Sequence, residues 1–149
     1  IASCCATGAK AANQNVETVE RMRLFGEKVG ICFQIKDDLF DYGSGEDIGK
    51  PSGIDIKEKK MTLPLIHALS QAPKRERRKI INTVKNNNND DKKVQEVINF
   101  VLQSGGIQYA SEKMYAYRDE ALSILNEFPE NEARESLKNL VLFTTERKK

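Results

Sequence analysis

The sequence predicts an all-α protein, and three observations lead to this prediction. Almost every segment of the 149 residues has apolar side chains at helical spacing. No run alternates apolar and polar residues for long enough to predict a strand. Most of the glycines and prolines stand between the periodic segments, where helices begin and end. We therefore expect one domain of helices packed side by side, joined by short loops.

The longest predicted helix covers residues 16–42. On a wheel with about 100° per residue, Gln34 and three aspartates fall within one strip about 100° wide. The aspartates are Asp37, Asp38 and Asp41. Apolar residues fall on the opposite side of the wheel, namely Phe25, Val29, Cys32, Leu39 and Phe40. Lys36 points away from the acidic strip, so we do not count it as a ligand.

The middle of the chain predicts two shorter helices. The first begins near Thr62, with Pro64 in its first turn, where proline is well tolerated. We expect it to turn Leu65, Ile66 and Leu69 inward. After Pro73, a basic helix should cover residues 75–85. The asparagine run 86–89 is expected to be an exposed loop, because asparagine is a poor helix former.

The last third predicts three more helices. Asp90 or Asp91 should cap a helix that runs to Ser104 and stops at two glycines. Residues 107–128 form another amphipathic segment. A last helix begins at Pro129, and we expect it to carry four apolar residues on one side: Leu137, Leu140, Val141 and Phe143.

Composition narrows the class of protein. A net charge of +2 is too small to argue for nucleic acid as a partner. No apolar run approaches the roughly 18 residues of an integral membrane segment. Three cysteines, Cys4, Cys5 and Cys32, fit neither a zinc pattern nor a disulfide framework. We interpret them as buried thiols of a cytoplasmic protein.

The acidic strip is the strongest indication of chemistry. Three carboxylates within five residues repel one another unless a cation lies between them. Mg²⁺ takes oxygen ligands and usually shares them with substrate phosphates. Lys50, which follows Gly49, would add a second positive charge for a diphosphate leaving group. The pattern thus allows metal-assisted ionisation of a diphosphate ester, and it assigns no catalytic acid, base or nucleophile.

Each of these residues also has a plainer interpretation. An acidic triplet on an exposed helix face usually has no function, and a loop lysine is usually just solvated. Their occurrence together and in order, on a helix with apolar residues opposite, favours the functional interpretation.

Three motifs give a resemblance to a known family. They are Phe33-Gln34-x-x-Asp37-Asp38-x-x-Asp41, Gly49-Lys50-Pro51-x-Gly53-x-Asp55 and Lys60-x-Thr62-Leu63-Pro64. Together they resemble the trans-polyprenyl diphosphate synthases, most of all the bacterial medium- and long-chain, octaprenyl-diphosphate-synthase-like members. The first motif resembles the second aspartate-rich motif of that family.

This resemblance implies the helical bundle of the isoprenoid synthases around a deep cavity. It implies Mg²⁺ as cofactor, and an allylic prenyl diphosphate and isopentenyl diphosphate as substrates. Asp37 would be the main metal ligand, and Asp38 and Asp41 would contact the metal through water or support its ligands. Gln34 and Lys50 would bind the allylic diphosphate, with Lys60 as a weaker candidate. The resemblance also implies a homodimer.

The departures from the family pattern matter as well. The first aspartate-rich motif and the isopentenyl diphosphate site have no match in this sequence. We therefore expect residues 1–149 to be the C-terminal helical portion of a polyprenyl synthetase domain that is inactive alone. Helices meant to line a cavity should then expose apolar faces, so we expect self-association. Product chain length cannot be read from these residues.

Two alternatives stay open at this point. The chain could be a non-catalytic helical partner subunit of a heteromeric synthase, although such a module would not need three aspartates and Lys50. A class I terpene cyclase is the other alternative. Its second metal motif usually carries Asn, Ser or Thr and Glu, whereas this one is all aspartate.

Overall fold

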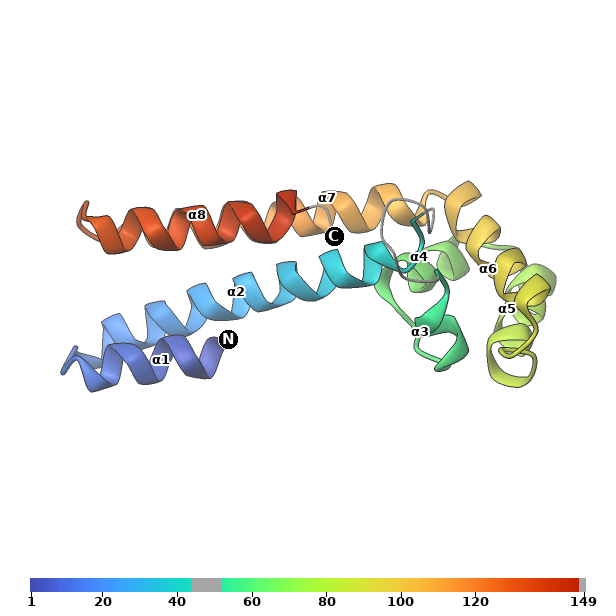
Figure 1. Cartoon of the computed structure of the whole chain (residues 1–149), viewed down its shortest axis with the longest axis horizontal. Coiled ribbons are helices and arrows are strands. Elements are labelled where there is room, and N and C mark those ends of the chain that lie inside the picture. Colours follow the sequence, from blue (N-terminus) through green and yellow to red (C-terminus); the bar gives the residue numbers. More distant parts are fainter. Residues whose placement is uncertain (44–51, 148–149) are drawn as a thin grey trace. The chain divides into compact units, whose positions relative to one another are not determined.

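The computed structural model describes residues 1–43 and 52–147. These residues form helices and turns without any strand, so the all-α prediction is confirmed. Figure 1 shows the helices in chain order: α1 (Ala2–Ala11), α2 (Val16–Phe40), α3 (Ile54–Lys57), α4 (Leu63–Gln71), α5 (Lys74–Asn86), α6 (Asp91–Gln103), α7 (Gly106–Asn126) and α8 (Glu132–Glu146). None of the described helices combines the length and the apolar character that a membrane crossing requires.

The described chain divides into two compact units. Unit 1 comprises residues 1–36 and 113–147, and unit 2 comprises residues 37–43 and 52–112. Helices α2 and α7 each contribute residues to both units.

Helix α2 has the bounds that its sequence favours. It begins after Asn15, whose side-chain carbonyl accepts a hydrogen bond from the Thr18 N–H at 2.8 Å. Such a cap satisfies a backbone donor that has no partner within the helix. The helix ends at Phe40, slightly earlier than predicted, and residues 41–43 continue as a turn. Its buried residues are Phe25, Gly26, Val29, Cys32 and Ile35, so the predicted apolar face is confirmed for most of its length.

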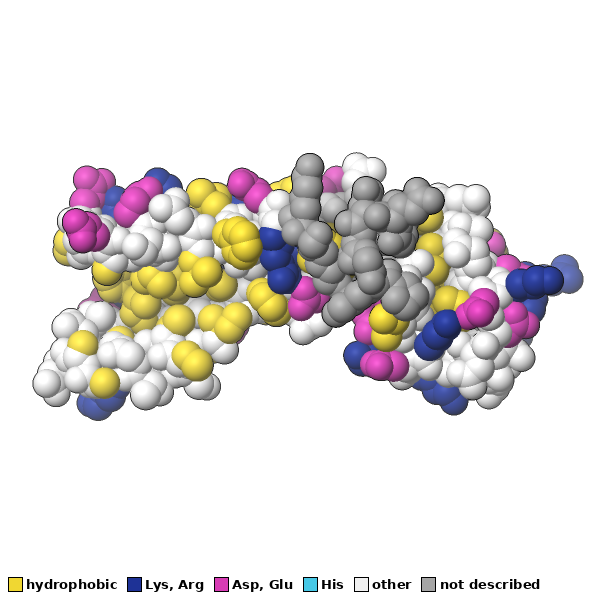
Figure 2. Space-filling model, viewed as in Figure 1, with side chains coloured by type: hydrophobic (Ala, Val, Ile, Leu, Met, Phe, Trp, Pro, Cys, Tyr) yellow, Lys and Arg dark blue, Asp and Glu magenta, His cyan; other side chains and the backbone are white. Residues whose placement is uncertain are grey.

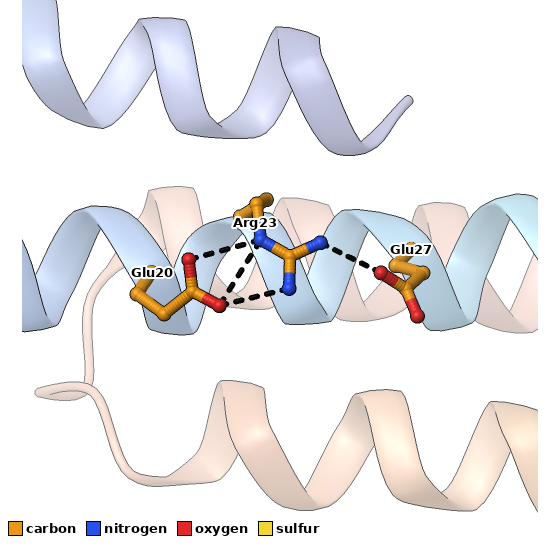
Figure 3. A network of polar contacts seen from close by, with 3 residues as sticks. All are labelled: Glu20, Arg23 and Glu27. Carbon is orange, nitrogen blue, oxygen red and sulfur yellow. Dashed lines mark hydrogen bonds and ion pairs between the residues drawn. The ribbon is translucent and has the colours of Figure 1, made fainter.

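Unit 1 has a small apolar core. Its buried residues come from α2, α7 and α8: Phe25, Val29, Ala121, Leu125 and Val141. Two ion pairs add to this packing. Lys28 on α2 pairs with Glu120 on α7, and Arg21 on α2 pairs with Glu127 in the turn after α7. On the outer face of α2, Arg23 lies between Glu20 and Glu27 and donates hydrogen bonds to both (Figure 3).

Helix α1 packs closely on α2 at Gly26. A Cβ placed on Gly26 would lie 2.8 Å from the Cys5 Sγ and 2.9 Å from the Ala2 Cα. Only glycine allows this approach without a shift of α1. Helix α1 nevertheless has no buried residue of its own.

Unit 2 has a larger core, built from α3 to α6 and the turn after α2. Its buried residues are Tyr42, Ile56, Leu65, Ala68, Leu69, Ile80, Val84, Val94, Val97, Ile98, Phe100 and Val101. The four-residue helix α3 was not predicted. It begins after Gly53, whose φ of +81° and whose closeness to the Val94 side chain both favour glycine. Asp90 caps α6 through the Lys92 and Lys93 N–H groups, as predicted.

One residue that was predicted to face inward is exposed: Ile66 on α4 is 49% exposed. On α8, where the prediction placed four apolar residues on one side of the helix, Leu140 and Phe143 are 57% and 63% exposed. The buried face of α8 carries Val141, Thr144 and Thr145 instead. The two threonine hydroxyls donate to the Leu140 and Leu142 carbonyls, which makes their burial possible.

Two other predictions about exposure hold only in part. Asn86, Asn87 and Asn89 are exposed as predicted, but Asn88 is buried, and its side-chain amide donates to the Lys57 carbonyl. Of the three cysteines only Cys32 is buried. Cys5 is half-buried and Cys4 is exposed, since α1 presents that side to solvent.

Candidate diphosphate and metal site

The predicted site residues lie at and just beyond the C-terminal end of α2. Gln34, Asp37 and Asp38 are within the helix, one turn apart, as the wheel predicted. Gln34 is exposed, while Asp37 and Asp38 are half-buried. Asp41 lies in the turn that follows, one residue after the end of the helix.

Asp41 binds the backbone of residues 53–55. Its two carboxylate oxygens accept hydrogen bonds from the Ile54 and Asp55 N–H groups, at 2.8 and 3.1 Å. Its carbonyl accepts a third from the Gly53 N–H at 2.9 Å. The Asp41 side chain therefore caps α3 from outside that helix and fixes residues 53–55 beside the end of α2.

Two opposing effects act on the Asp41 carboxyl. Burial, followed by the nearby negative charge of Asp55, raises its pKa above the ordinary value. The three backbone N–H groups act in the opposite direction, because they stabilise the carboxylate. A carboxylate held in this way has little freedom to turn toward a metal.

Lys60 lies on the same segment as Asp55. Its ammonium group is 3.1 Å from an Asp55 carboxylate oxygen and 2.6 Å from a Glu58 oxygen. The hydrogen bond that Lys60 donates to Glu58, and then the one it donates to Asp55, raises the pKa of Lys60. Lys60 is thus fully protonated, but a diphosphate would have to compete with two carboxylates for it.

A buried hydrogen bond supports the segment before α4. The Tyr42 and Thr62 hydroxyls lie 2.6 Å apart, and both residues are buried. Burial raises the Tyr42 pKa, so the phenol stays neutral. This bond ties the turn after α2 to the N-cap of α4 and holds the Lys60–Thr62 segment in place.

The carboxylates do not form a complete metal cage. Among the described residues, no three His, Cys, Asp or Glu side chains are grouped so that they could hold a metal ion. Lys50 lies outside the described residues, so its predicted role stays a prediction. The donors present are carboxylate oxygens on a helix. They suit Mg²⁺, which is commonly held by one or two carboxylates and completed by water and phosphate.

The comparison with known families decides what kind of protein carries this arrangement. Residues 1–101 match the polyprenyl synthetase family. The chain belongs to this family. The match includes α2, the Asp41 turn and α3 to α5, and thus every predicted site residue.

Individual members of the polyprenyl synthetase family are similar to this chain in sequence. The chain is 36% identical to the heptaprenyl diphosphate synthase component 2 of Geobacillus stearothermophilus, over 99% of this chain and 45% of that protein. It is 32% identical to the geranylgeranyl diphosphate synthase of Saccharolobus solfataricus, again over 99% of this chain and 45% of that protein. The chain therefore spans less than half the length of these relatives.

Solved structures of the family share the fold. A geranylgeranyl pyrophosphate synthase from Bacteroides thetaiotaomicron superposes with a TM-score of 0.89 at 34% identity, over 98% of this chain and 48% of that one. A polyprenyl synthase from Caulobacter crescentus, complexed with calcium and isoprenyl diphosphate, gives a TM-score of 0.85 at 30% identity, over 99% of this chain and 45% of that one.

Sequence reasoning missed two features near the site in this member of the family. One is the capping of α3 by Asp41, whose only sequence signal is an aspartate at the end of a helix followed by a Gly-x-Asp segment. The other is Arg147, whose guanidinium carbon lies 4.6 Å from the centre of the Phe33 ring, next to Gln34 in sequence. Burial, and then the charge of Arg147, lowers the pKa of Lys36. No local pattern predicts that contact, because it joins α2 to the end of the chain.

Proposed function

We propose that this chain supplies the part of a prenyl diphosphate synthase that binds the allylic diphosphate through Mg²⁺. Membership of the polyprenyl synthetase family supports the class of reaction. The observation that carries the assignment of the site is the strip at the end of α2. In this strip Gln34, Asp37 and Asp38 lie on one helical face, and Asp41 fixes residues 53–55 beside the end of α2.

The hydrogen bonds suggest how the aspartates divide their roles. Asp41 uses both carboxylate oxygens to cap α3, so we assign it to positioning. Asp37 and Asp38, one helical turn from Gln34 on the same face of α2, are the candidate metal ligands, with Asp37 as the main one. Two carboxylates would be sufficient, since water and the substrate diphosphate would complete the octahedron that Mg²⁺ prefers.

The chemistry follows from this arrangement. Bound Mg²⁺ would withdraw negative charge from the diphosphate and make it a better leaving group. Gln34 would donate an amide N–H to a diphosphate oxygen. Lys50, with Lys60 as a weaker contributor, would stabilise the charge that develops as the C–O bond breaks. The double bond of isopentenyl diphosphate would then attack the allylic cation, and a proton would be lost to diphosphate.

The complete reaction needs residues that this sequence does not contain. No first aspartate-rich motif occurs in it, and the chain spans 45% of its relative from Geobacillus stearothermophilus. We propose that residues 1–149 form the C-terminal portion of the synthase domain and do not elongate a prenyl chain alone. We propose a homodimer for the intact enzyme.

One observation favours a second candidate. The relative from Geobacillus stearothermophilus is named as a component of its synthase, and so a heteromeric arrangement is the alternative. In that case this chain would work with a different subunit. If it were the non-catalytic member, its aspartates would not be needed for turnover.

A turnover assay on the intact protein tests the proposal. We expect condensation of an allylic diphosphate with isopentenyl diphosphate only when Mg²⁺ is present. Asp37→Asn should lower kcat by roughly 100-fold to 1,000-fold, the loss typical of one group that stabilises developing charge. Asp91→Asn removes an equally charged but exposed aspartate, and it should change little.

Three results would contradict the proposal. Unchanged turnover in Asp37→Asn would favour the non-catalytic subunit. A cyclic hydrocarbon product would favour a terpene cyclase. Turnover by residues 1–149 alone would show that no further part is needed.

A further inference from the structure

Helix α5 concentrates positive charge in unit 2. Among its 13 residues are six Lys or Arg and one Glu, a net charge of +5. The whole chain carries a net charge of only +2, so the remainder of the chain is acidic overall. Figure 2 shows Lys and Arg side chains projecting in the region of α5.

Two of the six cations have structural roles. Arg77 donates hydrogen bonds to the Leu69, Ser70 and Ala72 carbonyls, at 2.8, 3.1 and 3.2 Å. It thereby satisfies carbonyls at the C-terminal end of α4. Lys79 lies 3.2 Å from a Glu96 oxygen on α6. Both residues thus already have a partner within unit 2.

The other four cations are exposed on one face. They are Lys74, Arg75, Arg78 and Lys85, which we call the cationic face. Within the described part of the chain, the side chains of these four residues make no hydrogen bond and no ion pair. On a helical wheel they fall within about 100° and extend over about 17 Å of helix.

The opposite side of α5 explains why the cationic face is fixed in orientation. Ile80, Thr83 and Val84 are buried against unit 2, with exposed fractions of 4%, 4% and 2%. The helix cannot rotate without exposing these residues. The four cations of the cationic face are therefore held on the outward side of α5.

We propose that the cationic face binds the anionic headgroups of a phospholipid bilayer. The choice of partner rests on the proposed function, because the product of a prenyl diphosphate synthase carries an apolar prenyl chain, whatever its length, that favours a membrane over water. Charge complementarity supports it, since a row of solvated cations attracts anionic lipid without any pocket. Nucleic acid is the poorer fit. Helix α5 has no aromatic side chain on which a base could stack.

The expected strength is modest. Each Lys or Arg near an anionic membrane surface strengthens binding about fivefold, so four cations give on the order of 1,000-fold in total. Such binding is reversible and decreases as salt screens the charges. It would hold the enzyme near the membrane without inserting any part of it.

Vesicle sedimentation with the intact protein tests this inference. The probes are vesicles of phosphatidylcholine, with or without phosphatidylglycerol, at low and at high salt. We expect binding only to the vesicles that contain phosphatidylglycerol, with loss at high salt. The triple variant Arg75→Gln, Arg78→Gln, Lys85→Gln should bind about 100-fold more weakly.

A matched variant separates the cationic face from net charge. Lys10→Gln, Lys59→Gln, Lys113→Gln removes the same charge from exposed positions outside α5 and should bind almost like the unmodified protein. Equal weakening by both variants would overturn the inference. So would failure to bind phosphatidylglycerol, or tighter binding to duplex DNA or RNA than to vesicles at the same salt.

The test is independent of turnover. Normal condensation activity without vesicle binding would overturn this inference alone. Vesicle binding that depends on the cationic face, in a protein without condensation activity, would overturn the proposed function and leave the membrane contact standing.

Discussion

Units 1 and 2 are both helical, but they differ in how they bury their apolar side chains. Unit 2 collects twelve buried residues into one core, whereas unit 1 collects five. In unit 1, α1 has no buried residue, and Leu140 and Phe143 stand exposed on α8. Figure 2 shows hydrophobic side chains along the helices of unit 1.

This difference shows which part has a complete core of its own. Unit 2 packs most of its apolar side chains into one core and leaves Met61, Ile66 and Leu102 exposed, so we expect its stability to depend less than that of unit 1 on residues outside it. Unit 1 has amphipathic helices with apolar residues left over. We interpret these as surface that other residues, or a second copy, would cover.

The largest expected effect is in the core of unit 2. Leu65 is fully buried there, so Leu65→Ala should lower the free energy of unfolding by about 3 kcal/mol, through lost burial and a cavity. Leu140→Ala, the same change on the exposed side of α8, should cost less than about 0.5 kcal/mol. Chemical denaturation measures both. Equal losses would remove the distinction between the two units.

The next effect concerns the approach of α1 to α2 in unit 1. Gly26→Ala places a Cβ 2.8 Å from the Cys5 Sγ, and relieving that clash should cost about 1–3 kcal/mol. Gly30→Ala is the matched control, because its nearest neighbour would lie 3.6 Å away. It should stabilise the helix by about 0.5–1 kcal/mol. A thermal melt in which both variants behave alike would show that α1 does not pack as described.

Burial of the Cys32 thiol should make the stability of unit 1 depend on pH. Burial raises the pKa of its thiol from 9.0 to about 11. Below pH 9 the thiol is neutral in both states, so no stability is lost there. Between pH 9 and about 11 the unfolded chain ionises first, and the folded state loses about 1–3 kcal/mol. Cys32→Ala should lack this contribution, which denaturation at several pH values measures. A constant difference between the two proteins would contradict it.

The smallest effect on stability should come from the exposed face of α8. Leu140→Ser with Phe143→Ser should change the free energy of unfolding by less than about 0.5 kcal/mol. The same variant should reduce self-association of residues 1–149, because it removes exposed apolar surface. Light scattering measures the assembly. A monomer before and after the change would show that this face has no role in association.

Much of the fold was predictable from local patterns. The start of α2 at Val16, the start of α4 after Thr62 and the Asp90 cap all depend on neighbouring residues, and the structure agrees with them. Ile66 was misplaced, because a helical wheel reports apolar residues and not what covers them. Helix α3 was missed since four residues are too short for any periodicity.

The site was predictable only in part. The helical spacing of Gln34, Asp37 and Asp38 follows from 3.6 residues per turn, and α2 indeed continues through them. The hydrogen bonds from Ile54 and Asp55 to Asp41 join residues 13 and 14 positions apart. Contacts between residues so far apart in the sequence leave no local pattern by which they could be predicted. These hydrogen bonds also change the interpretation of Asp41, from a third acid beside the metal to a residue that positions the segment.

Titration of the intact protein with inorganic diphosphate, with and without Mg²⁺, tests most directly whether the end of α2 is a magnesium diphosphate site. We predict binding that requires Mg²⁺ and that Asp37→Asn weakens by about 100-fold, since a metal-bridged contact supplies several kcal/mol. Asp91→Asn should leave it unchanged. Equally tight binding without Mg²⁺, or in Asp37→Asn, would contradict the assignment.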